Sequence, residues 1–173
     1  MPEDTTNTTN TIDTTETMET TQRITTISEV QEAVKAALEE NVWFGLHGVP
    51  LLVENAKDIE YQVKSAMSSV GITATVATPS LTYRGDYVHE PNDRHPYWEI
   101  SGLNVAVVEN PTLNRGRAGY ATALDTALQV AETLNGIPTV CNATIQQSVQ
   151  GGLVVVQVAA VSNIVFALEK SAT

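Results

Sequence analysis

The feature that most constrains this chain is a strand-like segment that ends abruptly and leads into a long helix. Residues 98–109 are rich in β-branched and other apolar side chains and are followed by Asn110-Pro111. Proline fixes φ and has no backbone N–H, so the strand must stop there. A polar link at 112–117 precedes an Ala-rich helical pattern that ends at Asn135-Gly136. The polar residues therefore gather at a strand exit, without a nucleophile–base pair, a phosphate loop or a metal-spaced cluster.

Length and composition indicate one domain with a terminal extension. The 173 residues are 42% hydrophobic but only 5% aromatic, which predicts a core of Val, Ala, Leu and Ile. A net charge of −11 with nine scattered Lys and Arg argues against nucleic-acid binding. The lone Cys141 cannot form an intrachain disulfide, and its strand pattern predicts a small core residue.

The start of the chain has neither the basic nor the apolar region of a secretory signal. No apolar run reaches the ~20 residues that span a bilayer. We therefore expect a soluble protein of intracellular origin, with no membrane partner.

The chain divides into a Thr-rich acidic extension, residues 1–23, and a single α/β domain, residues 24–173. Residues 1–22 hold ten Thr and five acidic residues but no Lys or Arg. Such a segment buries too little apolar surface to offset its ordering entropy, which predicts a disordered tail. Because Thr is β-branched and Ile12 is apolar, an extended arm on a neighbouring subunit is the alternative.

Periodicity within the domain predicts an α+β fold: a mostly antiparallel sheet with helices packed on one face and a long projecting hairpin loop. Residues 72–78 and 98–109 should pair antiparallel, and Gln150-Gly151-Gly152 should close a second hairpin. In the third helix Ala123, Leu124, Ala127, Leu128, Ala131 and Leu134 should face inward. The predicted helices are 29–40, 59–70 and 119–134; the predicted strands are 72–78, 98–109, 139–149 and 153–168, with 42–46 and 49–53 as a short strand or turn pair.

The segment 80–96 is long, polar and rich in proline, and compact domains rarely carry such a loop without a purpose. Aromatic residues on ordered loops are common contact anchors, so we predict an interface arm. A metal site at His89, Glu90, Asp93 and His95 is the alternative, but the spacing matches no strong zinc pattern. The interface residues predicted in and beside this loop are Tyr83, Arg84, Tyr87, His89 and Tyr97.

The link after the strand offers three more candidates: Asn114, Arg115 and Arg117. They can cap the strand-to-helix crossover within one subunit, because Asn and Arg bond free backbone groups. They can also pair with carboxylates of a neighbouring copy, which suits two close arginines in so acidic a chain. We expect the second role, because the arginines gain nothing from the positive end of the helix dipole that follows them.

Two stretches carry a resemblance to a known family. One is Val49-Pro-Leu-Leu-Val-Glu-Asn-Ala-Lys-Asp-Ile-Glu60, with the helix after it and the strand that ends at Pro79. The other is Val107-Val-Glu-Asn-Pro-Thr-Leu-Asn-Arg115, with the helix at 121–136. Together they resemble the small tail-terminator, or tail-completion, proteins of the neck of long-tailed bacteriophages. The likeness covers most of residues 27–168 and rests on element order and short motifs.

The resemblance implies a structural virion protein, assembled in the host cytoplasm and with no catalytic residue, metal or cofactor. Such a protein forms a homo-oligomeric ring, usually a hexamer, that caps the tail tube and joins it to the head-proximal connector. DNA would pass through the ring without being specifically bound, since an acidic lining does not attract phosphates. The alternatives are another neck or tube subunit, a non-enzymatic binding module, and an enzyme that uses the His89–His95 loop.

Overall fold

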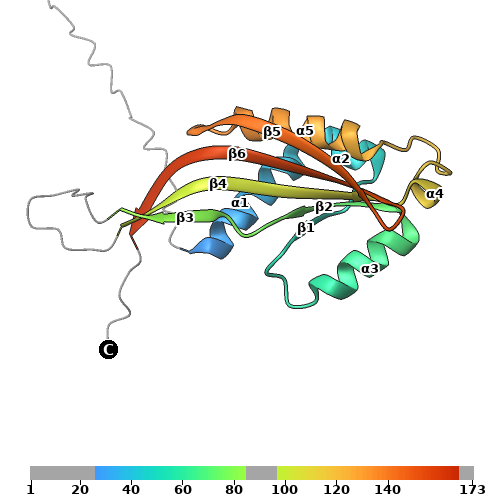
Figure 1. The fold of residues 1–173 in the computed structure, drawn as a ribbon, viewed down its shortest axis with the longest axis horizontal. Coiled ribbons are helices and arrows are strands. Elements are labelled where there is room, and N and C mark those ends of the chain that lie inside the picture. The colour runs from blue at the N-terminus through green and yellow to red at the C-terminus, as the bar shows by residue number, and fades with distance from the viewer. Residues whose placement is uncertain (1–25, 85–96, 168–173) are drawn as a thin grey trace, which may run out of the picture.

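The structure of this chain is a computed structural model that describes residues 26–84 and 97–167, with side chains undescribed at 97 and 164–167. The described residues form an α+β fold with five helices and one mostly antiparallel six-stranded sheet (Figure 1). The helices are α1 (Ile27–Glu40), α2 (Val42–His47), α3 (Ile59–Ser69), α4 (Pro111–Asn114) and α5 (Ala123–Gly136); the strands are β1 (Leu51–Val53), β2 (Ile72–Val76), β3 (Ser80–Tyr83), β4 (Tyr97–Glu109), β5 (Val140–Gln150) and β6 (Leu153–Ala167).

The sheet has the order β1-β2-β4-β6-β5, with β3 added beside β4. The predicted antiparallel pairing of residues 72–78 with 98–109 is confirmed, since Ile72 pairs with Glu109 and Val76 with Val105. β5 and β6 form the predicted hairpin, and only β1 and β2 run parallel among the described strands. The first residues of the predicted long loop, Ser80–Tyr83, form β3. The rest of the loop, 85–96, and the extension, 1–23, lie outside the described residues.

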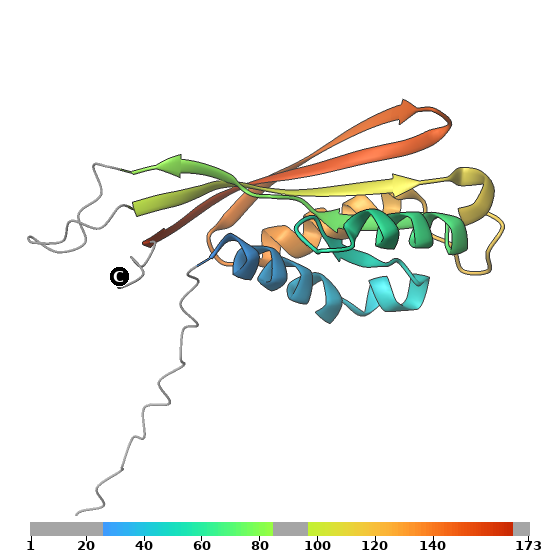
Figure 2. The same cartoon turned by 90° about the horizontal axis from the view of Figure 1, so that it is seen from below.

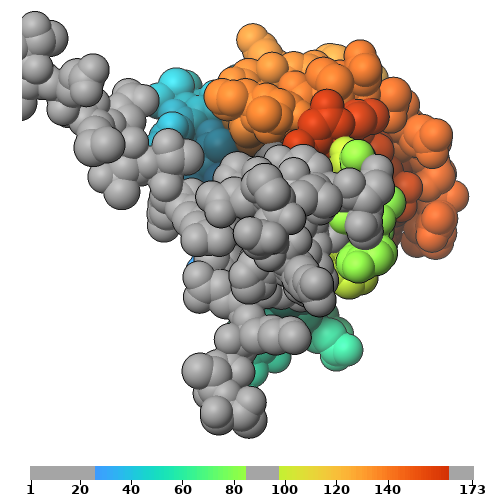
Figure 3. All heavy atoms as spheres, turned by 90° about the vertical axis from the view of Figure 1, so that its left-hand side faces the viewer, coloured from blue at the N-terminus to red at the C-terminus, as the bar shows by residue number. Residues whose placement is uncertain are grey.

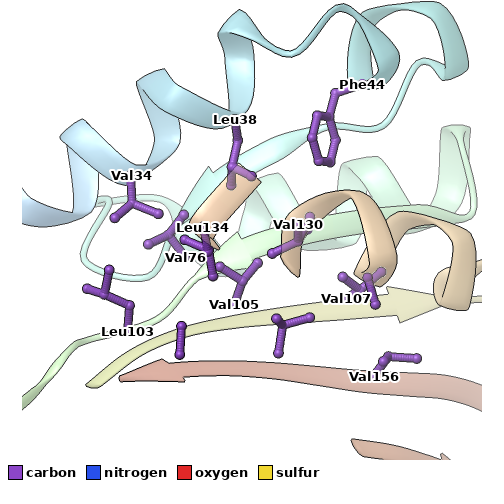
Figure 4. Packing of buried hydrophobic residues seen from close by; sticks show 14 of the residues in the cluster. Val34, Leu38, Phe44, Val76, Leu103, Val105, Val107, Val130, Leu134 and Val156 are labelled. Atoms are coloured by element: carbon purple, nitrogen blue, oxygen red, sulfur yellow. The ribbon is translucent and has the colours of Figure 1, made fainter. Parts of the chain in front are cut away.

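Helices cover one face of the sheet, and the β5–β6 hairpin leans away from them (Figure 2). Side chains from α1, α2 and α5 point toward the inward side chains of β2, β4 and β6 (Figure 4). Because strand residues alternate faces, the core uses every second residue of β4, from Leu103 to Val107. The labelled core residues are Val34, Leu38, Phe44, Val76, Leu103, Val105, Val107, Val130, Leu134 and Val156.

The first helix begins two residues earlier than the pattern predicted. Ser28 and Gln31 also have the spacing of a capping box, but the box is formed by Thr26 with Glu29. The Ser28 hydroxyl instead accepts a hydrogen bond from Asn55 Nδ2 at 2.6 Å. A capping box saturates two free N–H groups at a helix start, so the helix begins where both partners are in place.

The prediction of a short strand or turn at residues 42–46 was wrong, because these residues form α2. Asn41 caps this helix by accepting from the backbone N–H of Trp43 at 3.0 Å. It also donates to the Thr133 hydroxyl of α5 at 3.1 Å. Gly48 ends the helix with φ +58°, a conformation that glycine adopts without strain. A cap and a terminator thus override an apolar run that is typical of a strand.

Two side chains predicted to face inward from the last helix are exposed instead. Leu124 is 45% and Leu128 52% exposed, whereas Ala123, Ala127 and Leu134 are fully buried. The buried face of α5 is therefore formed by Ala123, Thr126, Ala127, Val130 and Leu134. Cys141 is also exposed rather than buried, because a register shift between Cys141 and Thr144 interrupts the alternation of β5.

Two of the leucines of α5, one buried and one half-exposed, provide a matched test of this orientation. We expect Leu134→Ala to destabilise the fold by about 2–5 kcal/mol, because it leaves a cavity in the core. Leu128→Ala, at a half-exposed position of the same helix, should cost under about 1 kcal/mol. Urea unfolding of the two variants measures both values, and equal losses would contradict the assigned face.

Candidate functional site

The most densely bonded polar cluster of the described residues lies at the exit of β4, and we call it the strand-exit network: Glu109, Asn114, Arg115, Arg117 and His47. Its centre is the carboxylate of Glu109, whose side chain is only 1% exposed. This carboxylate accepts hydrogen bonds from Asn114 Nδ2 at 2.9 Å, from Arg115 Nε at 3.1 Å and from the backbone N–H of Ala123 at 2.8 Å. Glu109 therefore joins the end of β4 to α4 and to the start of α5.

The charge of Glu109 is stabilised where it is buried. Burial by itself raises the pKa of this carboxyl, because the charged form loses its hydration. The N–H donors of Ala123, Asn114 and Arg115 act in the opposite direction and leave the pKa below its ordinary value. The carboxylate is thus ionised at neutral pH and serves as an acceptor, not as a proton donor.

Asn114 connects Glu109 to Ala121 and Arg117. It is fully buried, and its Nδ2 also donates to the carbonyl oxygen of Ala121 at 2.7 Å. Its Oδ1 accepts from Arg117 Nη2 at 3.0 Å. Every polar atom of this side chain is therefore bonded within the chain, and the predicted contact of Asn114 with a neighbouring copy stays a prediction.

The arginines also have partners inside their own chain. Arg115, half-exposed, forms an ion pair with Glu109 of its own chain, and its predicted contact with a neighbouring copy stays a prediction. Arg117 reaches toward α2, with Nη2 3.5 Å from the carbonyl oxygen of His47. Its buried Nε has no hydrogen-bond partner among the described residues. Both arginines cap the crossover within one subunit, as the alternative interpretation of the sequence proposed.

His47 fastens the link between α4 and α5 to α2. Its Nδ1 donates to the carbonyl oxygen of Gly119 at 2.8 Å, and its ring lies against Trp43 with centroids 4.4 Å apart. Thr122 then starts α5 with a capping box to Asp125. Hydrogen bonds from Thr122 hold the pKa of Asp125 below its usual value, with a smaller attraction from His47.

Gly71 joins the two stretches that carry the family resemblance. Its carbonyl oxygen accepts from the backbone N–H of Asn110 at 2.7 Å. A Cβ at this position would lie 2.6 Å from the backbone nitrogen of Asn114 and 2.9 Å from Leu113 Cβ. Residues 49–79 and 107–136 therefore meet at a contact that only glycine permits.

A second surface of interest is apolar and lies on α2, α5 and the link between them; we call it the α2–α5 surface. It holds half of the large hydrophobic side chains that are exposed in the described part of the chain. Beside them is an open hollow of about 230 Å³ lined by Trp43, His47, Asp125 and Leu128, among others. Tyr120 (42%) and Leu128 (52%) line this hollow, and Val42 (74%), Leu46 (78%) and Leu124 (45%) are the other exposed large hydrophobic residues of the same elements. Helical periodicity missed this surface because it assigned the α5 leucines to the core.

The predicted interface residues of the loop are only partly described. Tyr83 is 57% exposed, and its ring meets Trp98 edge to face at 5.5 Å. Arg84 pairs with Glu99 at 2.6 Å. Tyr87 and His89 lie outside the described residues, and for Tyr97 only the backbone, paired with Ala167, is described. The contact of this loop with another subunit therefore stays a prediction.

Neither a metal cluster nor a membrane-spanning helix occurs in the described ranges. No group of three or more His, Cys, Asp or Glu within 26–84 and 97–163 is arranged to hold a metal ion, and the candidates at 89–95 fall outside. No helix of these ranges is both long and apolar enough to cross a bilayer. Comparison with models of protein families, and with curated proteins, gives no match to this chain.

Removing the central carboxylate tests the network. Glu109→Ala leaves the backbone N–H of Ala123 and one of the two N–H bonds of Asn114 Nδ2 buried without an acceptor, at about 1–3 kcal/mol each, so the free energy of unfolding should fall by at least about 2 kcal/mol. Glu109→Gln keeps one acceptor oxygen and should cost less. Glu32→Gln, on the exposed side of α1, is the control and should be neutral within about 0.5 kcal/mol.

The pH dependence of stability gives a second test with the same variants. The pKa of Glu109 is depressed in the folded state, so its contribution is present above the ordinary value of 4.5 and is lost as the pH falls through the folded pKa. Thermal melting between pH 7 and 3 should therefore show a steeper loss of stability for the wild type than for Glu109→Gln. Parallel curves would show that this carboxylate does not favour the folded state.

Substitutions at two glycines distinguish the energetic cost of crowding from the cost of backbone strain. Gly71 and Gly119 both have positive φ, +76° and +68°, but only at Gly71 would an added Cβ meet other atoms within 4 Å. Gly119→Ala should cost about 1–2 kcal/mol from the left-handed conformation alone. Gly71→Ala should cost clearly more, because the backbone of α4 must move. Chemical denaturation measures the loss of stability in both variants, and equal losses would show that α4 does not pack on Gly71.

Proposed function

We propose that this protein is a structural virion subunit, a ring-forming tail terminator that caps the tail tube and joins it to the head-proximal connector. The observation that carries the proposal is the meeting of the two resembling stretches at Gly71 and Asn110. Residues far apart in the sequence thus form one structural unit, built around Glu109. This supports a resemblance that rests on element order and short motifs.

The α2–α5 surface supports a role in subunit contact. Large apolar side chains that cluster on the outside of a protein often mark an interaction site, whereas single exposed ones are normal. Here they lie on elements that the strand-exit network and Asn41 hold in fixed positions. We assign this surface to the contact between neighbouring copies in the ring. The partners above and below the ring would be the head–tail connector and the tail tube protein.

The other candidate function is a non-enzymatic binding module, and the hollow beside Trp43 is the observation that favours it. Its volume of about 230 Å³ is below the roughly 300–1,000 Å³ of typical ligand pockets. Its lining also belongs to the α2–α5 surface. We therefore place the ring first. Another neck or tube subunit of the same particle is the nearest structural alternative.

Charge placed on the α2–α5 surface tests the ring. Leu128→Glu should leave the subunit folded, with a stability change of about 1 kcal/mol or less at this half-exposed site. It should prevent ring closure and tail capping, because an unpaired carboxylate would be buried in the contact. Electron-microscopy class averages and capping of purified tail tubes measure the two losses.

The matched control is Tyr61→Glu on α3, where the side chain is 74% exposed and outside this surface. It adds the same charge and should leave ring and capping intact. A normal ring from Leu128→Glu would remove the α2–α5 surface from the proposal. A single copy per particle, or an open filament of wild-type subunits, would refute the ring itself.

A further inference from the structure

β5 is an edge strand with unusual chemistry. Among the described strands it pairs with β6 alone, and it is the outermost of the five in the main order. Its residues from Gln146 to Gln150 are all exposed, including Val149 at 67%. In the end-on view the orange atoms of β5 lie on the outside of the molecule (Figure 3). An edge of this length presents a row of unpaired N–H and C=O groups.

Edge strands of soluble proteins are usually protected by charged residues, prolines or bulges. The sequence has no Asp, Glu, Lys, Arg or His from Thr133 to Leu168, in a chain with a net charge of −11. β5 itself has no proline, and its register shift lies at the start, between Cys141 and Thr144. The regular part, 144–150, is therefore open to pairing with another strand.

The other exposed edges do not match β5. β1 has three residues and β3 has four, whereas β5 has eleven. A head-to-tail contact from β5 to either of these edges would leave most of β5 unpaired. Another β5 is the one described edge with the same length.

We propose that two copies of this chain pair antiparallel along β5, about a two-fold axis at Gln147. In this register Ile145 of each copy lies opposite Val149 of the other, on the face that carries the core. Gln146 lies opposite Ser148 on the outer face. Register fixes these faces because Ile145 pairs with Val158 and Gln147 with Val156, both buried core residues. No like charges meet, and cross-strand apolar pairs stabilise the contact.

The pairing makes the two sheets continuous and closes on itself, because the same strand serves both copies. The free backbone N–H and C=O groups of the β5 edge then gain hydrogen-bond partners, as they do wherever a strand is added to a sheet. No acidic residue occurs in the paired segment itself. This inference does not depend on the proposed ring.

A charge placed at the two-fold axis is the most direct test of the β5 pairing. Gln147→Lys places two ammonium groups opposite each other, so we expect the full-length wild type to be a dimer and this variant a monomer at the same micromolar concentration. Gln157→Lys adds the same charge to an exposed position of β6, one strand away from the edge, and should remain a dimer. Sedimentation velocity of the three proteins gives the result.

A cross-link tests the register independently of any folding defect. In a Cys141→Ser background, Gln147→Cys should form an intermolecular disulfide on mild oxidation, because directly opposed Cα atoms of antiparallel strands lie about 4.5–5.5 Å apart, within the roughly 4.4–6.8 Å that a disulfide spans. Gln157→Cys in the same background should not. A monomeric wild type overturns the proposal. So does a dimer that tolerates Gln147→Lys and gives no Gln147→Cys cross-link, since its contact must lie elsewhere.

Discussion

The crossover from sheet to helices depends on one buried carboxylate. Glu109 ends β4 on the core side of the sheet, where a charge without partners would be costly. Its three donors come from α4, from the link and from the first residue of α5. The carboxylate therefore fixes where α5 starts relative to the sheet, and the buried face of α5, which includes Ala127, Val130 and Leu134, then packs against that sheet.

The surfaces to which we assign function follow from this constraint. The link between α4 and α5 is held at Asn114 through Ala121, and at His47 through Gly119. Tyr120 lies between these two fastening points and so projects from a backbone that is fixed on both sides. The exposed leucines of α5 lie one and two turns further on. An internal network of polar contacts thus positions an external apolar surface.

Most strands and the strand exit were predictable because the signals are local. Alternation identified β2, and an apolar run stopped by Asn110-Pro111 identified β4, whereas β3 lies in a segment expected to be a loop. The face of α5 was not predictable, because alanine and leucine repeat together and periodicity does not say which row meets the sheet. The roles of Asn114 and Arg115 depended on Glu109, five and six residues earlier, whose burial no short-range pattern reveals.

The two proposed contacts have different symmetry, and this determines what each assembly can be. A contact through the α2–α5 surface to a different face of the next copy is heterologous and closes a ring when the rotation allows. A β5 pair is isologous and joins only two copies. A chain that uses both contacts at once closes with dihedral symmetry, with β5 pairs joining two rings. A chain that forms a single ring must open its β5 pairs first, and each freed edge is then available to a strand of the tube or connector.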